Sequence, residues 1–423
     1  MRGRTRKPVL LSIAPDIAPT IATGGAKRNP SDSKKNILRL PAVARCLLFC
    51  LAPLLFHGAM AFGQARPPVG PGPVMVHSKF GGQIYGFDID QNGTEGLLAE
   101  NKSLADGNVL AAIETFDQTT GDIISVISKT ETQDNFLTLG VAGMSVGLTE
   151  QEQVQGGFVV KRVFKTLNPL DSNKINGNWT PPIDSEHLIM PTGVSRNQGE
   201  PNVAVFAYDN SGNFIPDVFE SNVGKNTFGP VVPITDSLNF ASVPPPIAFD
   251  SATKQAILGG GDGCFDCLPV IGLVNLVTGT FSEFTGTGFG FINGIAADSA
   301  DGIFCTTTED DANVEFYNLA TEQGTNVVLP GSGGQQFFSG ADVEFDSINK
   351  LFLVAQPNSS SVSSGSTIYV YSTNGALQET LNGFSFSNAF GLIPAHIALH
   401  PSLRSGYVDG PETSVNALQS FTY

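Results

Sequence analysis

The chain has 423 residues, of which 47 are glycine and 27 are proline, and only 15% are charged. One hydrophobic core rarely grows beyond about 300 residues, so this length excludes a single simple core and indicates several domains or a modular array. The formal net charge of −16 gives an acidic surface that repels nucleic acids and anionic lipid head groups, and we therefore expect neither as a partner.

Residues 1–65 are predicted to be an export leader. Residues 1–45 contain ten Lys and Arg against two Asp and Glu, and an apolar run follows over residues 46–56. The small residues Ala59 and Ala61 complete the order basic, apolar, small that is typical of a signal peptide. The apolar run is too short to span a bilayer. We therefore expect a secreted protein, periplasmic or extracellular, with no integral membrane span once the signal is removed.

Residues 66–79 are predicted to be a linker. They begin with the sequence RPPVGPGPV, and such a Pro- and Gly-rich composition favours a connecting segment over a packed one. The folded domain is then expected to occupy residues 80–423. Its abundant Val, Ile, Phe and Thr suit short strands, and we predict an all-β domain with very little helix.

A candidate calcium site comes first in the folded domain. Asp88, Asp90 and Asn92, followed by Gly93, have the Asp-x-Asp-x-Asn-Gly spacing of a calcium loop, which gathers oxygen ligands around a hard cation. The twelfth position of the loop is Ala99 where a complete site has glutamate, so an ordinary hairpin turn is the alternative. No cofactor is certain, and Ca²⁺ or another divalent cation is the one that the sequence indicates.

Four segments in the second half share a hairpin pattern. Each has a short apolar strand, a turn residue and a returning apolar strand, with turn residues spaced by 48, 48 and 54 at Asp250, Asp298, Asp346 and His400. An Asp side chain can bond the backbone two residues on and so begins a tight turn. A second hairpin follows later in the unit, clearest at Asn374-Gly375. Two hairpins make a four-stranded sheet, which is one blade of a β-propeller.

The spacing predicts the number of blades. Residues 113–117 match the first hairpin of an earlier unit, and the 283 residues from Asp117 to His400 divide into six intervals of about 47. We therefore predict seven four-stranded blades, with six or eight as alternatives. Residues 84–93 look like the second hairpin of a unit that lacks its first. N-terminal strand material is expected to complete the last blade, because a closed ring leaves no open edge.

One blade resembles a known family. Residues 391–401, followed by Tyr407-Val408, resemble the blades of YVTN and NHL-like β-propellers, in which Pro precedes an Ile-Ala strand and a turn. The match is good in this blade and partial in three others. This resemblance implies a ring-shaped scaffold and does not imply an activity.

Three cysteines lie in the predicted mature chain. Cys264 and Cys267 lie in a Gly-rich loop without the helix start that a thioredoxin-type redox pair needs, and no further zinc ligands lie nearby. In an exported protein we predict a local disulfide between them. Cys305 is expected to be a buried thiol at the place that Leu258 takes in its own unit.

Three polar residues are candidates for a catalytic centre. His396, Asp342 and Asn293 hold corresponding positions before the first strands of their units. Propeller lactonases and hydrolases carry metal ligands or a histidine on the loops that enter the central channel. A purely structural role is the alternative, because no known catalytic motif occurs in the chain.

The sequence favours a binding or interaction scaffold over an enzyme. Its partner could be a protein, a glycan or a small molecule, and nothing in the residues selects one. The alternatives are a lactonase or hydrolase with a divalent cation in the channel, and a surface adhesion or structural protein. An enzyme should bring carboxylate, Asn or His groups together at metal-binding distance, whereas a scaffold needs only a stable ring.

Overall fold

The computed structural model divides the chain into Met1–Ala65 and Arg66–Tyr423, and all the residues that it describes belong to the second unit. These residues are 69–91, 93–132, 139–142, 145–154, 157–167, 175–179, 191–196, 203–209, 216–222, 227–230, 232–233, 246–261, 268–286, 290–308, 313–330, 341–357, 366–384, 395–409 and 417–423. Every regular element among them is a β-strand, so this part of the chain has no helix that could cross a membrane.

The described strands pair into seven antiparallel sheets, and the first three come from residues 83–233. The first sheet contains β2 (Gln83–Ile89), β3 (Glu95–Ser103), β4 (Val109–Asp117) and β5 (Ile123–Thr132). The second contains β6 (Leu139–Ala142), β7 (Ser145–Val154), β8 (Gly157–Leu167) and β9 (Ile175–Trp179). The third contains β10 (Pro191–Arg196), β11 (Val203–Asp209), β12 (Pro216–Asn222), β13 (Thr227–Phe228) and β14 (Val232–Pro233).

The other four sheets come mainly from the second half of the chain. The fourth contains β15 (Ile247–Asp250), β16 (Gln255–Gly261), β17 (Pro269–Asn275) and β18 (Phe281–Thr285). The fifth contains β19 (Ile292–Asp298), β20 (Ile303–Thr308), β21 (Asn313–Asn318) and β22 (Gln323–Val328). The sixth contains β23 (Asp342–Asp346), β24 (Leu351–Gln356), β25 (Ser366–Ser372) and β26 (Leu377–Phe384). The last contains β27 (His396–His400), β28 (Ser405–Asp409), β29 (Ala417–Thr422) and β1 (Gly70–His77).

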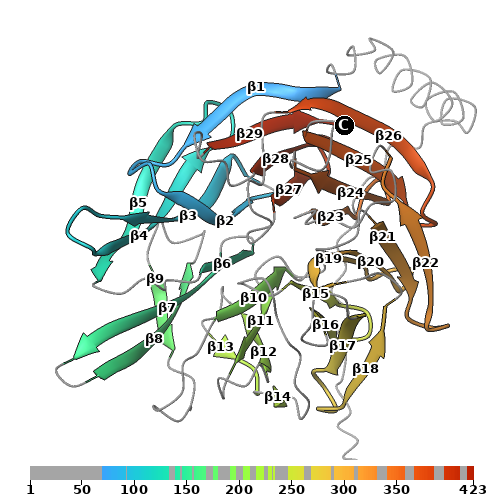
Figure 1. Cartoon of the computed structure of the whole chain (residues 1–423), viewed down its shortest axis with the longest axis horizontal. Coiled ribbons are helices and arrows are strands. Elements are labelled where there is room, and N and C mark those ends of the chain that lie inside the picture. The colour runs from blue at the N-terminus through green and yellow to red at the C-terminus, as the bar shows by residue number, and fades with distance from the viewer. Residues whose placement is uncertain are drawn as a thin grey trace, which may run out of the picture. The chain divides into compact units, whose positions relative to one another are not determined.

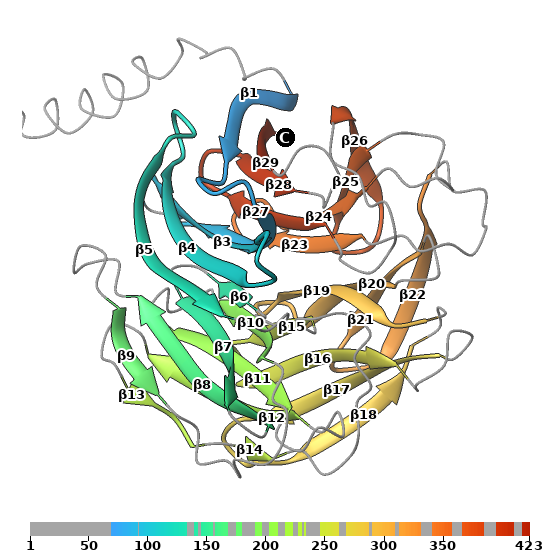
Figure 2. The same cartoon turned by 60° about the vertical axis from the view of Figure 1, so that its left-hand side comes forward.

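The sheets follow one another around a common centre, as Figures 1 and 2 show. The innermost strand of each sheet packs against the innermost strand of the next. These strands are β2, β6, β10, β15, β19, β23 and β27, and β27 packs in turn against β2. This arrangement is a β-propeller and confirms the predicted fold class.

The last sheet contains strands from both ends of Arg66–Tyr423. β1 pairs with β29 at the edge of this sheet, where Figure 1 shows the blue and red strands side by side. The segment expected to be a linker over residues 66–79 therefore contains a strand. Proline is tolerated there because an edge strand leaves one side of its backbone unpaired. Gly72 lies against Ser420, whose Oγ accepts a hydrogen bond from Val74 N at 3.1 Å, so the glycine allows this close approach.

The order of hairpins in the first sheet differs from the prediction. Residues 84–93 belong to the first hairpin, β2–β3, and not to the second hairpin of an incomplete unit. Residues 113–117 lie in β4, which forms the outer hairpin with β5. Asp117 Oδ1 accepts Thr119 N at 2.6 Å, just as Asp250 Oδ1 accepts Ala252 N at 2.9 Å. Because inner and outer hairpins use the same Asp turn, the turn residue alone could not tell them apart.

The sheets pack on one another through buried aromatic and β-branched side chains. Between the fifth and sixth sheets, Phe345 and Phe352 lie 4.6 Å apart by ring centroid, and Phe316 packs against Phe352 at 5.7 Å. Cys305 is a buried free thiol in this cluster, as predicted. Its register places it opposite Ala296, two residues before Asp298, so its counterpart in the fourth sheet is Ile257 and not Leu258. A shift of one residue in a strand changes the face on which a side chain lies.

The turn of the repeated inner hairpin needs a left-handed residue at its end. Lys254, Lys350 and Arg404 have φ angles of 56°, 57° and 50° there, and Gly302 has 64° at the same place in the fifth sheet. Positive φ strains a side-chain-bearing residue and suits glycine. The long cationic side chains fold back over aromatic rings, with Lys350 Nζ 5.6 Å from the centroid of Phe345.

Candidate functional sites

The three predicted catalytic candidates lie at the starts of innermost strands in consecutive sheets. Asp342 is the first residue of β23, His396 is the first residue of β27, and Asn293 is the second residue of β19. These strands pack side by side, β19 on β23 and β23 on β27. The structure places Asp342 and His396 in equivalent positions, opposite Ala355 and Asp409 in their strand pairings. The equivalent residue of β19 is Gly294, opposite Thr307, and Asn293 lies one residue earlier at a register shift, so its predicted correspondence with the other two is wrong by one residue.

His396 is held by an aspartate that the sequence did not single out. Asp409, the last residue of β28, lies opposite His396 in the strand pairing. Its Oδ1 lies 3.0 Å from His396 Nδ1 and accepts a hydrogen bond from His396 N at 2.8 Å. Burial would lower the pKa of His396, but the charge and hydrogen bond of Asp409, together with the charge of Asp342, raise it. The pair therefore favours a protonated imidazole ring.

Asp342 connects two sheets through its carboxyl group. Its Oδ1 accepts Val343 N at 2.8 Å, and its Oδ2 accepts Ile397 N from the next sheet at 3.2 Å. Burial raises the pKa of Asp342 to about 7, although His396 and the two amides act in the opposite direction. A Cβ at Gly294 would lie 2.6 Å from Asp342 Oδ1, so the glycine lets β19 approach this carboxyl group.

The contacts of this cluster are mainly structural. Asn293 is buried, and its Nδ2 has no hydrogen-bond partner within the described part of the chain. The described residues contain no group of three or more His, Cys, Asp or Glu that could hold a metal ion. His396 and Asp409 share a hydrogen bond within the last sheet, and the bond from Ile397 N to Asp342 Oδ2 ties the sixth sheet to the last. A catalytic centre at this place stays a prediction.

The predicted calcium ligands lie in the first hairpin of the first sheet. Asp88 Oδ1 accepts a hydrogen bond from Ile89 N at 2.7 Å, and the backbone of Asp90 closes the turn by donating to Glu95 O at 2.9 Å. Asn92 lies outside the described residues. The geometry of the described part is that of an ordinary hairpin, and calcium binding stays a prediction.

The predicted disulfide cannot be placed in the fold. Cys264 and Cys267 both lie outside the described residues, between β16 and β17. Their pairing stays a prediction from the spacing of the two cysteines and from the expected export of the chain.

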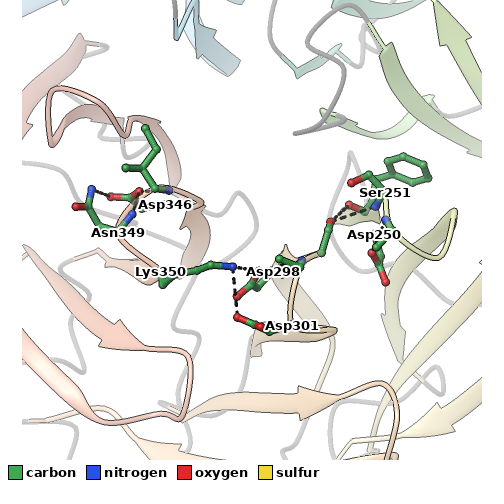
Figure 3. A network of polar contacts seen from close by, with 12 residues as sticks. Asp250, Ser251, Asp298, Asp301, Asp346, Asn349 and Lys350 are labelled. Carbon is green, nitrogen blue, oxygen red and sulfur yellow. Dashed lines mark hydrogen bonds and ion pairs between the residues drawn. The ribbon is translucent and has the colours of Figure 1, made fainter. Parts of the chain in front are cut away.

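A network of polar contacts joins the inner hairpin turns at the other end of the same strands (Figure 3). Ser299 Oγ accepts Ser251 N at 3.1 Å and donates to Phe249 O at 3.3 Å, which joins the fourth and fifth sheets. Lys350 Nζ lies 2.7 Å from Asp298 Oδ1 and 3.3 Å from Asp301 Oδ2, which joins the fifth and sixth sheets. Each turn is thus held by its neighbour. A Ser follows both Asp250 and Asp298 in the sequence, and this recurrence could have indicated part of the network.

The turns of the sixth and last sheets are joined in the same way and expose two apolar side chains. Asn349 Nδ2 donates to Asp346 Oδ2 at 2.7 Å and lies 3.3 Å from Pro401 O in the last sheet. Ile348 and Leu403, on these two joined turns, are 63% and 64% exposed. We call them the apolar turn pair. Sequence reasoning did not single them out, because each is one apolar residue within a polar turn.

Similarity to solved structures is at the level of the fold. One similar structure is described as the Cps50 (Swd1) β-propeller domain of Myceliophteria thermophila, with 11% identity, a TM-score of 0.50, and coverage of 84% of this chain and 100% of that chain. A second is a chain of a structure described as the Mitotic Checkpoint Complex, with 13% identity, a TM-score of 0.50, and coverage of 95% and 99%. No family model and no curated protein matches the chain.

Proposed function

We propose that this chain is an exported β-propeller that binds a protein partner, with the apolar turn pair at the centre of the contact. The observation that carries this proposal is that Ile348 and Leu403 lie exposed on two turns that are hydrogen-bonded to each other. The proposal of export rests on the basic and apolar order of residues 1–56.

The turns that carry the apolar turn pair are preorganised. Asp346 Oδ1 accepts Ile348 N at 2.9 Å and Asn349 N at 2.8 Å, and its Oδ2 accepts the hydroxyl of Tyr423 at 2.7 Å. Leu403 N donates to His400 O at 3.1 Å. A partner that covers such turns loses little conformational entropy in ordering them, so more of the burial of the two side chains appears as affinity.

The surroundings of the pair indicate the chemistry of the partner. The charge of Lys350 is compensated by Asp298 and Asp301, and Arg404 Nε donates to Tyr423 O at 2.8 Å. The charged residues around the apolar turn pair are therefore already paired within the protein, and the two apolar side chains are the surface left for a partner to cover. A partner with an apolar contact and a polar margin fits this pattern, which is the usual anatomy of a protein interface.

Two further observations support a scaffold. The resemblance of residues 391–401, followed by Tyr407-Val408, to YVTN and NHL-like blades implies a ring-shaped scaffold. One similar structure is a chain of the Mitotic Checkpoint Complex, and that protein therefore works within a protein assembly. The lactonase or hydrolase alternative would instead need a cation in the channel.

The proposal is tested by quantitative affinity capture, in which three forms of the mature protein are used to bind partners from the exported proteins of the source cells. These are the unchanged protein, the double variant Ile348→Ser and Leu403→Ser, and the control Val277→Ser, which removes a side chain that is 76% exposed on an outer hairpin. Burying each aliphatic side chain contributes about 1.5–3 kcal/mol, so the double variant should lower the affinity for a specific partner at least about tenfold.

The control distinguishes this contact from nonspecific binding by any exposed apolar side chain. We expect a protein whose recovery falls with the double variant and is unchanged with Val277→Ser, while all three forms melt at the same temperature. If no captured protein depends on Ile348 and Leu403, or if the control loses the same proteins, the proposed contact is wrong.

A further inference from the structure

Two buried glutamates lie under the segment that joins β1 to β2. Glu100 of β3 and Glu114 of β4 are both fully buried. Glu114 lies opposite Leu98 in the strand pairing, so the two glutamates are diagonal neighbours on one face of the first sheet. Glu114 Oε1 is buried and has no hydrogen-bond partner within the described part of the chain, and the neighbouring Glu100 raises the pKa of Glu114.

Both carboxyl groups hold the same short segment of backbone, residues 78–82. Glu100 accepts Phe80 N at 3.1 Å on Oε1 and Gly82 N at 2.6 Å on Oε2. Glu114 Oε2 accepts Lys79 N at 2.9 Å. A turn closes the segment, since Gly81 N donates to Ser78 O at 3.3 Å. The three amides of this short segment all donate to the two carboxyl groups, and successive backbone N–H groups in a turn are a common binding site for anions.

This segment holds the first strand of the domain in place. It leads directly from β1, which pairs with the C-terminal strand β29, to β2 in the first sheet. Lys102 Nζ donates to Phe80 O at 2.5 Å, and Lys129 Nζ lies 5.3 Å from the centroid of the Phe80 ring. The two glutamates and these two lysines are therefore the side chains that fix the connection between the last sheet and the first.

The protonation of Glu100 and Glu114 should respond to pH, because two carboxylates lie next to each other in a buried region. Burial raises the pKa of Glu114 to about 7, the Lys79 amide and charge lower it, and Glu100 raises it further. Among other charged groups near this sheet, Lys129 is paired with Glu131 at 2.8 Å. β6, which packs against β2 and β3, has no titratable residue in its sequence, whereas β27, which packs against β2, brings His396 and His400.

We propose that Glu100 and Glu114 form a proton-sharing latch on residues 78–82, which holds β1 at acidic pH and loosens it as the pH rises. With one proton between them, one carboxyl group donates to the other and both still accept backbone amides. When that proton leaves, two negative charges face each other in a buried place and repel. The stabilisation is complete below the ordinary glutamate range and is lost as the pH rises through about 7.

The test is hydrogen exchange of the full mature chain, followed by mass spectrometry between pH 5 and pH 9 and corrected for intrinsic exchange rates. In the unchanged protein the opening constant of residues 70–82 should rise on the order of 100-fold over this range. In Glu114→Gln it should change little, because the amide keeps an acceptor for Lys79 N and removes one charge. The control Glu283→Gln removes an exposed carboxylate from β18 of the fourth sheet and should behave like the unchanged protein.

A second variant keeps the result decisive if Glu114→Gln does not fold. Glu100→Gln also removes one of the two facing charges and should flatten the same pH dependence. The proposal is overturned if residues 70–82 show no pH dependence in the unchanged protein. It is equally overturned if both glutamine variants keep the full pH dependence. This includes the case in which each variant raises the opening constant by the same factor at every pH.

Discussion

Replacing Lys350 with methionine should leave a buried carboxylate without its cation. Lys350 Nζ lies 2.7 Å from Asp298 Oδ1, and the side chain of Asp298 is 1% exposed whereas that of Lys350 is 40% exposed. Methionine keeps the length and apolar stem of lysine, and its φ strain at this turn position is the same. The substitution therefore removes the contacts of the ammonium group with Asp298, Asp301 and the Phe345 ring, while the apolar stem of the side chain is kept.

The magnitude follows from the burial of the two partners. Removing one partner of a fully buried pair costs about 3–5 kcal/mol, while an exposed pair contributes about 0–1 kcal/mol. Because water screens the exposed ammonium group, we expect an interaction energy of about 1–2 kcal/mol between Lys350 and Asp298. The loss of the cation over the Phe345 ring adds about 0.5 kcal/mol to the effect of the single variant.

A double-mutant cycle isolates this interaction. The free energy of unfolding in urea is measured by circular dichroism for the unchanged protein, Lys350→Met, Asp298→Asn and the double variant. Asp298→Asn should cost less when residue 350 is already methionine. Lys254→Met is the matched control, because Lys254 has the same turn position but only a 3.8 Å contact to a partly exposed glutamate. An interaction energy below about 0.3 kcal/mol would refute the reasoning.

Two further predictions concern the turns and the histidine cluster. Gly302→Ala should lower the free energy of unfolding by about 1 kcal/mol, and Lys254→Gly should raise it by about 0.5–1 kcal/mol, because both positions have positive φ. Urea unfolding measures both changes, and two changes of the same sign would contradict this reasoning. Asp409→Asn should lower the pKa of His396, followed by NMR titration, because it removes the charge that raises that pKa. An identical titration of His396 in Asp409→Asn would contradict the assignment. In the unchanged protein the stabilisation by this pair is complete at acidic pH and is lost as the pH rises through the pKa of folded His396.

The second half of the fold could be predicted because its repeat signals agree. Asp250, Asp298 and Asp346 each end an innermost strand, and their spacing of 48 residues matches three successive sheets. In the first half the same Asp turn occurs in an outer hairpin at Asp117, so the pattern was assigned to the wrong pair of strands. Local turn chemistry determines that a hairpin forms, but not its place in the sheet.

The segment before the domain shows a second limit of composition. Pro- and Gly-rich residues favour a linker when only the chain is considered. At the edge of a sheet, however, proline loses no hydrogen bond, and Gly72 can approach Ser420 closely. Whether such a segment forms a strand depends on β29, which lies more than 300 residues later in the chain.

The polar clusters could be predicted only in part. His396 and Asp342 were found because they precede repeated strands. Their partner Asp409 lies 13 residues beyond His396, across a strand pairing that only the fold defines. Glu100 and Glu114 gave no signal at all, because the backbone amides that they bind belong to residues 79, 80 and 82 in a separate turn.

The closing of the ring by the first strand is tested most directly by a pair of cysteines. Met75 lies opposite Gln419 in the pairing of β1 with β29, and both side chains are partly exposed. Met75→Cys with Gln419→Cys should form a disulfide on oxidation, detected as a linked peptide pair by mass spectrometry. Val76→Cys with Gln419→Cys is the control, because neighbouring residues of a strand point to opposite faces. A link in the first pair but not in the control is expected, and the absence of a link in the first pair would contradict the closed ring.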